Sequence, residues 1–363
     1  MSVFIAPTWD TTLADRWGSE GLSSGAAALV ESPKREDSAE WTPTAFPDTS
    51  RTRNRKRRFE AESILRGHRP TASGERGRSY GVCICGKFSR NDQPSGDISV
   101  EVTVAGKTTV RGAQYCGSTW TCADCATHIG VTRGAFVERA ITKLREEGYR
   151  CVMTTMTVPH QLEESCGTVF DRLKAAHAKL DAHGSYRDLL KRSKYIGRIR
   201  VIEITYGASG WHVHSHEIQV FEGSGGETSA AQDTAWAQAF QSAVFPTWDR
   251  IIRSVTGKAA SLKHGFTAVP VWSANDYVAK LPEHARKRDD ENAQRKAERK
   301  PTRDRWGASA EITKAHVKKA EGGGKTPWDI LDDSHYGDAA ARELFLDYAK
   351  STWNRTQFET TKH

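Results

Sequence analysis

The sequence predicts an α+β protein with an antiparallel sheet at its centre. Two β-rich runs, residues 200–206 and 210–221, flank the short turn Gly207-Ala208-Ser209-Gly210, as in a β-hairpin. Another strand is predicted over residues 266–272, and apolar residues at helical spacing predict an amphipathic helix over residues 162–180. Strands joined by hairpins are antiparallel, and helices flanking such a sheet give the α+β class.

The other elements follow from the same two patterns. Apolar residues on one side and charged residues on the other predict a helix over residues 134–147, which Gly148 ends. Residues 150–160 form a β-rich run that predicts a central strand. Either its end brings His160 to a functional site, or the strand is only part of the core. A later helix is expected to stop at Pro246, where a second helical piece begins.

Length and charge favour an anionic partner. The chain has 363 residues, a formal net charge of +8 and a pI of about 9.1. Nucleic acid is the leading candidate for that partner. The alternative is that the chain is simply a soluble basic protein. No apolar run reaches the roughly 18 to 20 residues of a membrane span. Asp10, Asp15 and Arg16 leave no secretory hydrophobic segment, so a cytoplasmic protein is expected.

The first 78 residues predict a disordered basic tail. Their Ser, Thr, Ala, Pro and charged residues show no sustained period, and such a segment buries too little apolar surface to offset its ordering entropy. Within it, Arg51-Thr52-Arg53-Asn54-Arg55-Lys56-Arg57-Arg58 holds six cations in eight residues. A run of this kind is usually a solvated segment; beside DNA it would add phosphate affinity that salt weakens.

The cysteine spacing predicts a zinc-binding element over residues 79–130. Three of the seven cysteines lie close together, at Cys116, Cys122 and Cys125. The last two form a CxxC, which can present two thiolates to one Zn²⁺. Cys83, Cys85 and His128 are all candidates for the fourth ligand, with Cys85 the tentative choice. A redox CxxC and ordinary buried cysteines are the alternatives.

The strongest signal for chemistry is the run Gly210-Trp211-His212-Val213-His214-Ser215-His216. Because side chains on a strand alternate faces, His212, His214 and His216 point the same way. Pairing Gly207 with Gly210 in the hairpin places Glu203 opposite His214, on the same face. Three imidazoles and one carboxylate then predict a divalent metal site, with a chance cluster of surface histidines as the alternative.

A second feature is Tyr277 with Lys280. On a short helix capped by Ser273, the two residues are three positions apart and share a face. Most helical tyrosines are packing residues. Beside a metal, however, a phenol with an adjacent cation makes a coherent nucleophile for a phosphodiester.

Three of these segments resemble the motifs of HUH endonucleases. Residues 153–160 resemble the first motif, residues 210–221 resemble the histidine motif in its three-histidine form, and Tyr277-Val278-Ala279-Lys280 resembles the nucleophile motif. With the cysteines upstream, their order is most similar to plasmid rolling-circle replication initiators, the Rep proteins of the single-tyrosine type. The resemblance spans roughly residues 80–350.

The resemblance implies a DNA-nicking transesterase with a nuclease core over residues 131–300 and a helical C-terminal region over 301–363. Tyr277 would attack origin DNA to give a 5′-phosphotyrosyl bond and a free 3′-OH, assisted by Lys280. Mn²⁺ or Mg²⁺ would be bound by about three of His212, His214, His216 and Glu203. The implied partners are double-strand origin DNA, single-stranded DNA, and a host helicase and polymerase.

One position departs from the pattern that the resemblance implies. Single-tyrosine initiators are expected to carry a carboxylate one helical turn before the tyrosine to activate water at termination, but Ser273 and Ala274 stand there. The alternatives are a conjugative relaxase or transposase with the same chemistry, and a zinc-dependent DNA-binding regulator without it.

Overall fold

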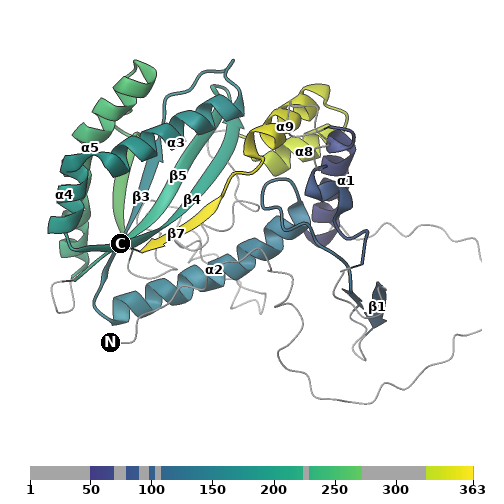
Figure 1. The fold of residues 1–363 in the computed structure, drawn as a ribbon, viewed down its shortest axis with the longest axis horizontal. Coiled ribbons are helices and arrows are strands. Elements are labelled where there is room, and N and C mark those ends of the chain that lie inside the picture. Colours follow the sequence, from purple (N-terminus) through teal and green to yellow (C-terminus); the bar gives the residue numbers. More distant parts are fainter. Residues whose placement is uncertain are drawn as a thin grey trace, which may run out of the picture.

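The core of the computed structural model is a five-stranded antiparallel sheet in the order β6-β3-β5-β4-β7 (Figure 1). The structure describes residues 50–68, 79–89, 98–102, 108–223, 229–271 and 324–362. The strands are β3 (Arg150–Thr157), β4 (Tyr195–Gly207), β5 (Gly210–Phe221), β6 (Phe266–Val271) and β7 (Phe358–Lys362). Every neighbouring pair is antiparallel, and helices flank the sheet, so the predicted α+β class is confirmed.

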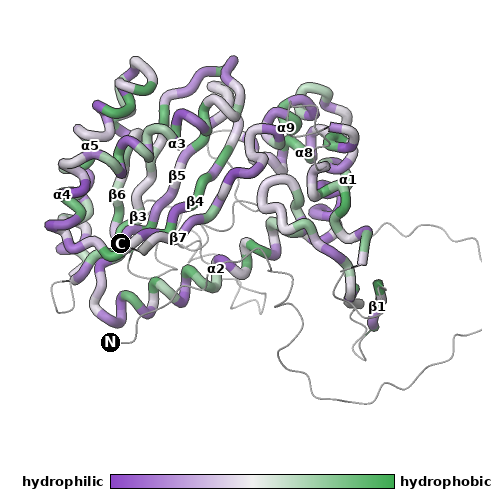
Figure 2. The backbone as a smooth tube through the Cα atoms, in the orientation of Figure 1, coloured by the Kyte–Doolittle hydropathy of each residue, from purple (hydrophilic) through white to green (hydrophobic). Residues whose placement is uncertain are grey.

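Helices cover both faces of the sheet. One face packs on α3 (Cys166–Ala182), α4 (Gly184–Arg192) and α5 (Ala230–Thr256), and the other packs on α2 (Ala123–Glu146). The alternation of β5 explains the division, because Val213 joins the first cluster and Ile218 joins the second. Figure 2 shows that β5, although central, is hydrophilic over much of its length. A polar strand in the middle of a core calls for a chemical explanation.

A second group of helices stands beside the sheet (Figure 1). It comprises α1 (Ser50–Leu65), the 3₁₀ turn η1 (Gly81–Ile84), α8 (Pro327–His335) and α9 (Ala339–Thr352), and α1 contacts α2, α8, α9 and η1. A short hairpin of β1 (Ser99–Val102) and β2 (Thr108–Arg111) forms a separate two-stranded sheet.

Helix α1 contradicts the prediction of a disordered tail for residues 50–65. Ala61, Ile64 and Leu65 are fully or almost fully buried, which gives the helix an apolar stripe at its C-terminal end. Arg57 donates two hydrogen bonds to Asp332 of α8, at 2.8 and 2.5 Å. The many cations of this segment hide the apolar stripe when only the composition is considered. One of the partners of α1, Asp332, lies 275 residues away in the chain.

Two predicted helix boundaries were also wrong. Helix α2 begins at Ala123, not Gly134, and so runs through residue 130, where the predicted cysteine element ends. Helix α5 continues through Pro246. An internal proline costs about 3 kcal/mol, but Val244 before it and Trp248 after it enter the same core, so burial on both sides offsets that cost.

The C-terminal region is not only helical. Its last strand, β7, pairs with β4 at the edge of the central sheet. Where the described chain resumes, Lys325 exchanges backbone hydrogen bonds with Tyr206 of β4, at 2.7 and 2.8 Å. The C-terminal segment is therefore part of the same core. Within the described ranges, no helix combines the length and apolar character needed to cross a membrane.

Candidate metal centres

Strand pairing brings Glu203 together with two of the three predicted histidines. Glu203 lies opposite His214 in the β4–β5 register, as predicted from the Gly207–Gly210 turn. Its Oε2 atom lies 3.3 Å from His214 Nε2 and 3.2 Å from His216 Nε2. We call Glu203, His214 and His216 the carboxylate-histidine cluster; all three residues are buried.

The geometry of this cluster fits a divalent cation. Two ligand atoms bound at about 2.1 Å to one metal are separated by about 3.0 Å in an octahedral site and about 3.4 Å in a tetrahedral one. The two measured N···O distances, 3.2 and 3.3 Å, fall between these values. Two nitrogens and one oxygen converge without filling a coordination shell, which leaves positions for other ligands.

The outer ring nitrogens of the two histidines differ. His216 Nδ1 lies 3.1 Å from the Thr155 hydroxyl of β3, a contact that orients the ring with Nε2 toward Glu203. His214 Nδ1 is buried and has no hydrogen-bond partner among the described atoms. His214 is therefore held mainly by packing and by its contacts within the carboxylate-histidine cluster.

His212 lies beside the cluster rather than in it. Its ring centroid is 4.7 Å from that of His214, but the three-residue group that converges on one point excludes it. His160, which follows β3, lies 5.0 Å from His212 between ring centroids. The four rings thus form a row, which we call the histidine row: His160, His212, His214 and His216. Burial and the neighbouring His214 lower the pKa of His212 to about 3, so His212 is neutral at physiological pH.

A glycine explains why His160 is delivered to this row. Gly210 has φ of +87°, and a Cβ atom built there would lie 2.6 Å from the Gln161 carbonyl oxygen. The turn between β4 and β5 therefore packs directly against the segment after β3, with no space for a side chain. Of the two sequence readings of the strand over residues 150–160, delivery of His160 to the site is the one this packing supports.

The opposite face of β5 carries a buried polar network. Ser215 Oγ lies 2.8 Å from His177 Nε2 of α3, and the guanidinium of Arg200 donates to Glu217. Gln219 donates to Glu217 at 3.1 Å. These partners satisfy most of the polar groups that alternate with the histidines, which is how a central strand tolerates them. The Gln219 Oε1 atom is the exception among them, since it is buried and has no hydrogen-bond partner among the described atoms. Nothing in the local sequence around His177 signals this role.

The four-cysteine cluster is the second candidate centre. It consists of Cys85, Cys116, Cys122 and Cys125. Three Sγ···Sγ distances are 3.7 Å: Cys85 to Cys125, Cys116 to Cys125, and Cys122 to Cys85. A tetrahedral zinc site with Zn–S bonds of about 2.3 Å has sulfur separations of about 3.8 Å, whereas a disulfide has about 2.05 Å. All four cysteines are free thiols, and these three separations match those of a tetrahedral metal site.

The structure selects the fourth member of the cysteine cluster. Cys85 belongs to it, whereas Cys83 and His128 lie outside the converging group. Hydrogen bonds, the largest from Cys116, lower the pKa of Cys85 and that of Cys125, whereas the same network raises the pKa of Cys116 and that of Cys122. Two of the four sulfurs are therefore biased toward the thiolate form that binds metals. Cys122 and Cys125 lie at the start of α2, so a bound ion would tie that helix to the segment around η1.

The predicted nucleophile pair lies outside the described residues. Tyr277 and Lys280, with Ser273 and Ala274 before them, fall between Val271 at the end of β6 and Gly324. Their predicted roles are therefore not tested by the geometry above.

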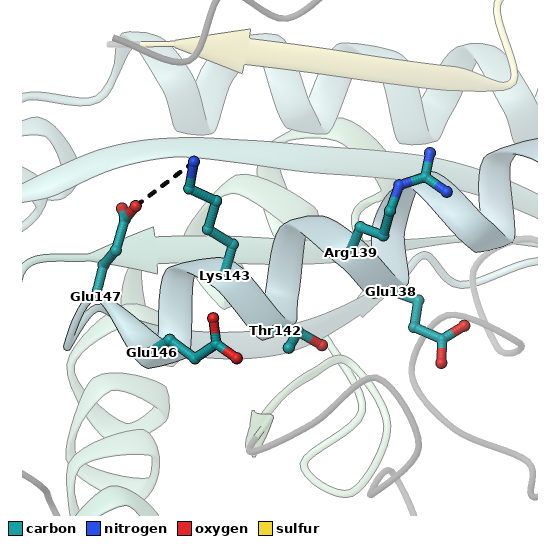
Figure 3. A pocket seen from close by; sticks show the side chains of 6 residues that line it. All are labelled: Glu138, Arg139, Thr142, Lys143, Glu146 and Glu147. Atoms are coloured by element: carbon teal, nitrogen blue, oxygen red, sulfur yellow. Dashed lines mark ion pairs between the residues drawn. The ribbon is translucent and has the colours of Figure 1, made fainter. Parts of the chain in front are cut away.

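A shallow depression on α2 is a separate feature (Figure 3). It is lined by Glu138, Arg139, Thr142, Lys143, Glu146 and Glu147. Lys143 and Glu147 form an ion pair of 3.8 Å, and the acids and bases along this surface largely balance one another. None of these residues belongs to either metal centre, so the depression adds no group to them.

Comparison with known proteins gives one informative relative. No protein-family model matches the chain, and no solved structure matches it significantly. The chain is 26% identical over 267 residues to a Streptomyces lividans protein named Protein rep, an alignment that covers 66% of this chain. It spans 57% of the length of that relative. The chain is thus similar, over about two thirds of its length, to the protein named Protein rep.

Proposed function

We propose that this protein is a plasmid rolling-circle replication initiator that nicks origin DNA by metal-dependent tyrosine transesterification. The observation that carries the proposal is the carboxylate-histidine cluster, because its three ligands converge on one point of a central strand. The similarity to Protein rep supports a role in replication. The motif order along the chain supports the HUH class.

The proposed reaction replaces one phosphodiester with another. The phenol oxygen of Tyr277 attacks the scissile phosphorus, a P–O bond to tyrosine forms, and the bond to the 3′ oxygen breaks. The phenol gives up its proton to solvent or a base, and the departing 3′ oxygen gains one to become a free 3′-OH primer. The 5′ end remains on Tyr277, so the energy of the cleaved bond is conserved.

The described residues prepare the site for this reaction. Glu203, His214 and His216 would hold Mn²⁺ or Mg²⁺, and the imidazole-rich set favours Mn²⁺. Such an ion supplies Lewis-acid polarisation of a non-bridging phosphate oxygen. Thr155 orients the ring of His216, and neutral His212 adds no positive charge next to the ion. Lys280 is proposed to favour the phenolate of Tyr277 and to hold the phosphate.

Chain length allows the nucleophile to reach the cluster. Val271 pairs with Cys151, whereas Thr267 pairs with Thr155 beside His216, so the cluster lies four residues, or about 13 Å, back along β6. Tyr277 lies six positions after Val271, a stretch that can span at most about 20 Å when fully extended. A covalent connection of this length is compatible with attack at the metal site.

For the four-cysteine cluster we propose a structural Zn²⁺. Its four sulfur ligands complete a tetrahedral shell, which leaves no open position for substrate. Its role is to hold the start of α2 against the segment around η1.

The decisive experiment is a cleavage assay on end-labelled single-stranded oligonucleotides that tile the replicon carrying the gene. With Mn²⁺, a denaturing gel is expected to show a covalent protein–DNA band at one tile. EDTA, Tyr277→Phe and His216→Ala should each abolish the band. The control variant Tyr336→Phe, at a tyrosine that is 84% exposed, should leave it intact.

Two outcomes would contradict the proposal. A covalent band that persists in Tyr277→Phe would assign the nucleophile to another residue. No band with any tile, despite tight binding to duplex DNA, would favour a zinc-dependent DNA-binding regulator.

A further inference from the structure

Helix α1 carries a cluster of exposed cations that the nicking chemistry does not use. Residues 51–58 of α1 hold six cations. Arg57 is buried and Arg58 is half-buried, and both make contacts within the fold, while Arg53 is exposed but also has an interaction of its own. Arg51, Arg55 and Lys56 are exposed. We call these three residues the basic face of α1. No ion pair joins them to any carboxylate in the described part of the chain.

The helix that presents this face is firmly attached. Besides the Arg57–Asp332 pair, Arg58 donates to the Cys85 carbonyl at 3.3 Å and lies 3.4 Å from Asp124. Asn54 donates to Thr127 of α2 at 2.7 Å. The inward side of α1 is thus tied to the four-cysteine cluster and to α2, and α2 runs from there to the sheet (Figure 1). The exposed cations therefore have a fixed position relative to the metal face of the sheet.

The charge pattern of α1 opposes its own stability. Its first turn has no acidic residue, and cations occupy the end where the helix dipole and the free N–H groups are already positive. Each such placement costs a few tenths of a kcal/mol in an isolated helix. A bound polyanion would instead make the electrostatic contribution of these cations favourable. The surface of α2 in Figure 3 differs, since acids there neutralise the bases.

We propose that the basic face of α1 binds the phosphate backbone of duplex DNA. The choice of DNA among polyanions rests on the proposed function. Arg51 and Arg55 are one turn apart, about 6 Å along the helix axis, and a duplex presents a charge every 1.7 Å or so, which allows simultaneous contacts. Single-strand binding uses rows of stacking aromatics, whereas Phe59 is the one exposed aromatic on the described α1. The inferred role is sequence-independent anchoring of the duplex beside the origin.

The test is the salt dependence of duplex binding by the full chain. The variant Arg51→Ala/Arg55→Ala/Lys56→Ala removes three exposed cations from α1. The matched control Lys174→Ala/Arg187→Ala/Lys191→Ala removes three exposed cations from α3 and α4, at the other side of the sheet (Figure 1). Affinity for an unrelated 30-base-pair duplex is measured by fluorescence anisotropy across a series of KCl concentrations.

The plot of log Kd against log salt should lose about 2 to 3 units of slope in the α1 variant and less than about 1 in the control. The charge-retaining variant Arg51→Lys/Arg55→Lys should keep the wild-type slope, which separates loss of charge from misfolding. Equal slopes in the two triple variants would overturn the proposal. Equal loss of single-stranded and duplex affinity would overturn the duplex assignment.

The nicking assay separates this proposal from the proposed function. The α1 variant should still nick a short single-stranded oligonucleotide, because none of its substituted residues lies in the carboxylate-histidine cluster. The wild-type protein could nick no oligonucleotide while the α1 variant still shows a smaller slope of log Kd against log salt for duplex DNA. That result would contradict the proposed function and support the proposal for the basic face of α1.

Discussion

At the scale of single residues, the two histidines of the carboxylate-histidine cluster are held by different contacts. Thr155 holds His216 through its outer ring nitrogen, while His214 Nδ1 has no such partner among the described atoms. Partners of this kind fix the ring orientation and tautomer of a ligand before the metal arrives. Metal affinity should therefore be sensitive to Thr155, although Thr155 is not a ligand.

Thr155→Val is expected to weaken Mn²⁺ binding by about 10- to 100-fold, because it removes the hydroxyl that orients His216. Isothermal titration of the full chain with Mn²⁺ measures the change. Thr154→Val serves as the control, since Thr154 is the preceding residue on β3 but faces the polar network on the other side of the sheet. An equal loss of Mn²⁺ affinity in both variants would mean that disturbing β3, and not removing the Thr155 hydroxyl, weakens binding.

His177 makes stability depend on pH. Burial, and next the positive charge of Arg200, lower its pKa well below the ordinary 6.5. Below pH 6.5 His177 binds a proton in the unfolded chain but stays neutral in the folded chain. The free energy of unfolding therefore falls as the pH falls below 6.5. Between pH 7.5 and 5.5 this histidine should lower the free energy of unfolding by roughly 1 kcal/mol.

Urea unfolding at pH 7.5 and 5.5 checks this expectation, and His177→Gln should reduce the pH dependence. Some dependence should remain, because burial also lowers the pKa of His128 and that of His212. An unchanged pH dependence in His177→Gln would rule out His177 as a source.

At the scale of elements, the four-cysteine cluster lies where α1, η1 and α2 meet. The cluster joins the segment around η1 to the start of α2, and α1 contacts both. Buried apolar residues also line this junction, among them Ile64, Val82 and Ala126, and a bound ion would add its binding free energy to their packing.

Removal of metal by a thiol-competing chelator should therefore speed amide hydrogen exchange in α1 and in the first turns of α2. Exchange in β3 and β5 should stay slow, because the sheet has its own core. Cys116→Ser should reproduce the effect, and Cys166→Ser, a buried cysteine outside the cluster, is the control. Uniform acceleration across the chain would contradict a local role.

At the scale of the whole molecule, the C-terminal strand completes the sheet. Phe358 of β7 is 8% exposed and packs in the cluster that joins α2 to the sheet, under the guanidinium of Arg133 at 4.8 Å. Strand β7 also pairs along β4, which would otherwise be the sheet edge. The far end of the chain thus stabilises the strand that carries Glu203.

Phe358→Ala should lower the free energy of unfolding by about 3 kcal/mol, the usual cost of deleting a buried phenylalanine. Chemical denaturation measures the loss. Phe59→Ala, at a phenylalanine that is 50% exposed, should cost less than about 1 kcal/mol. Similar losses in the two variants would show that β7 is not integral to the fold.

The sequence predicted much of the sheet and of the candidate site, for a local reason. The period of two along β5 and the Gly207–Gly210 turn determine which residues share a face and which oppose one another, so Glu203 opposite His214 followed without a structure. Cys116, Cys122 and Cys125 were likewise close enough in the chain to propose together.

Long-range packing decided the rest. Local pattern cannot show that His212 lies beside the carboxylate-histidine cluster while His216 belongs to it. Nor can it show that Cys85, and not Cys83, is the fourth member of the cysteine cluster. The close packing of Gly210 on the segment that follows His160 is likewise visible only in the structure. Nor does local pattern show the apolar stripe of α1, whose partners are in α8 and α9, or the His177–Ser215 contact behind the strand. Local sequence determines the alternation of side chains, whereas contacts between residues distant in the chain select which of them converge.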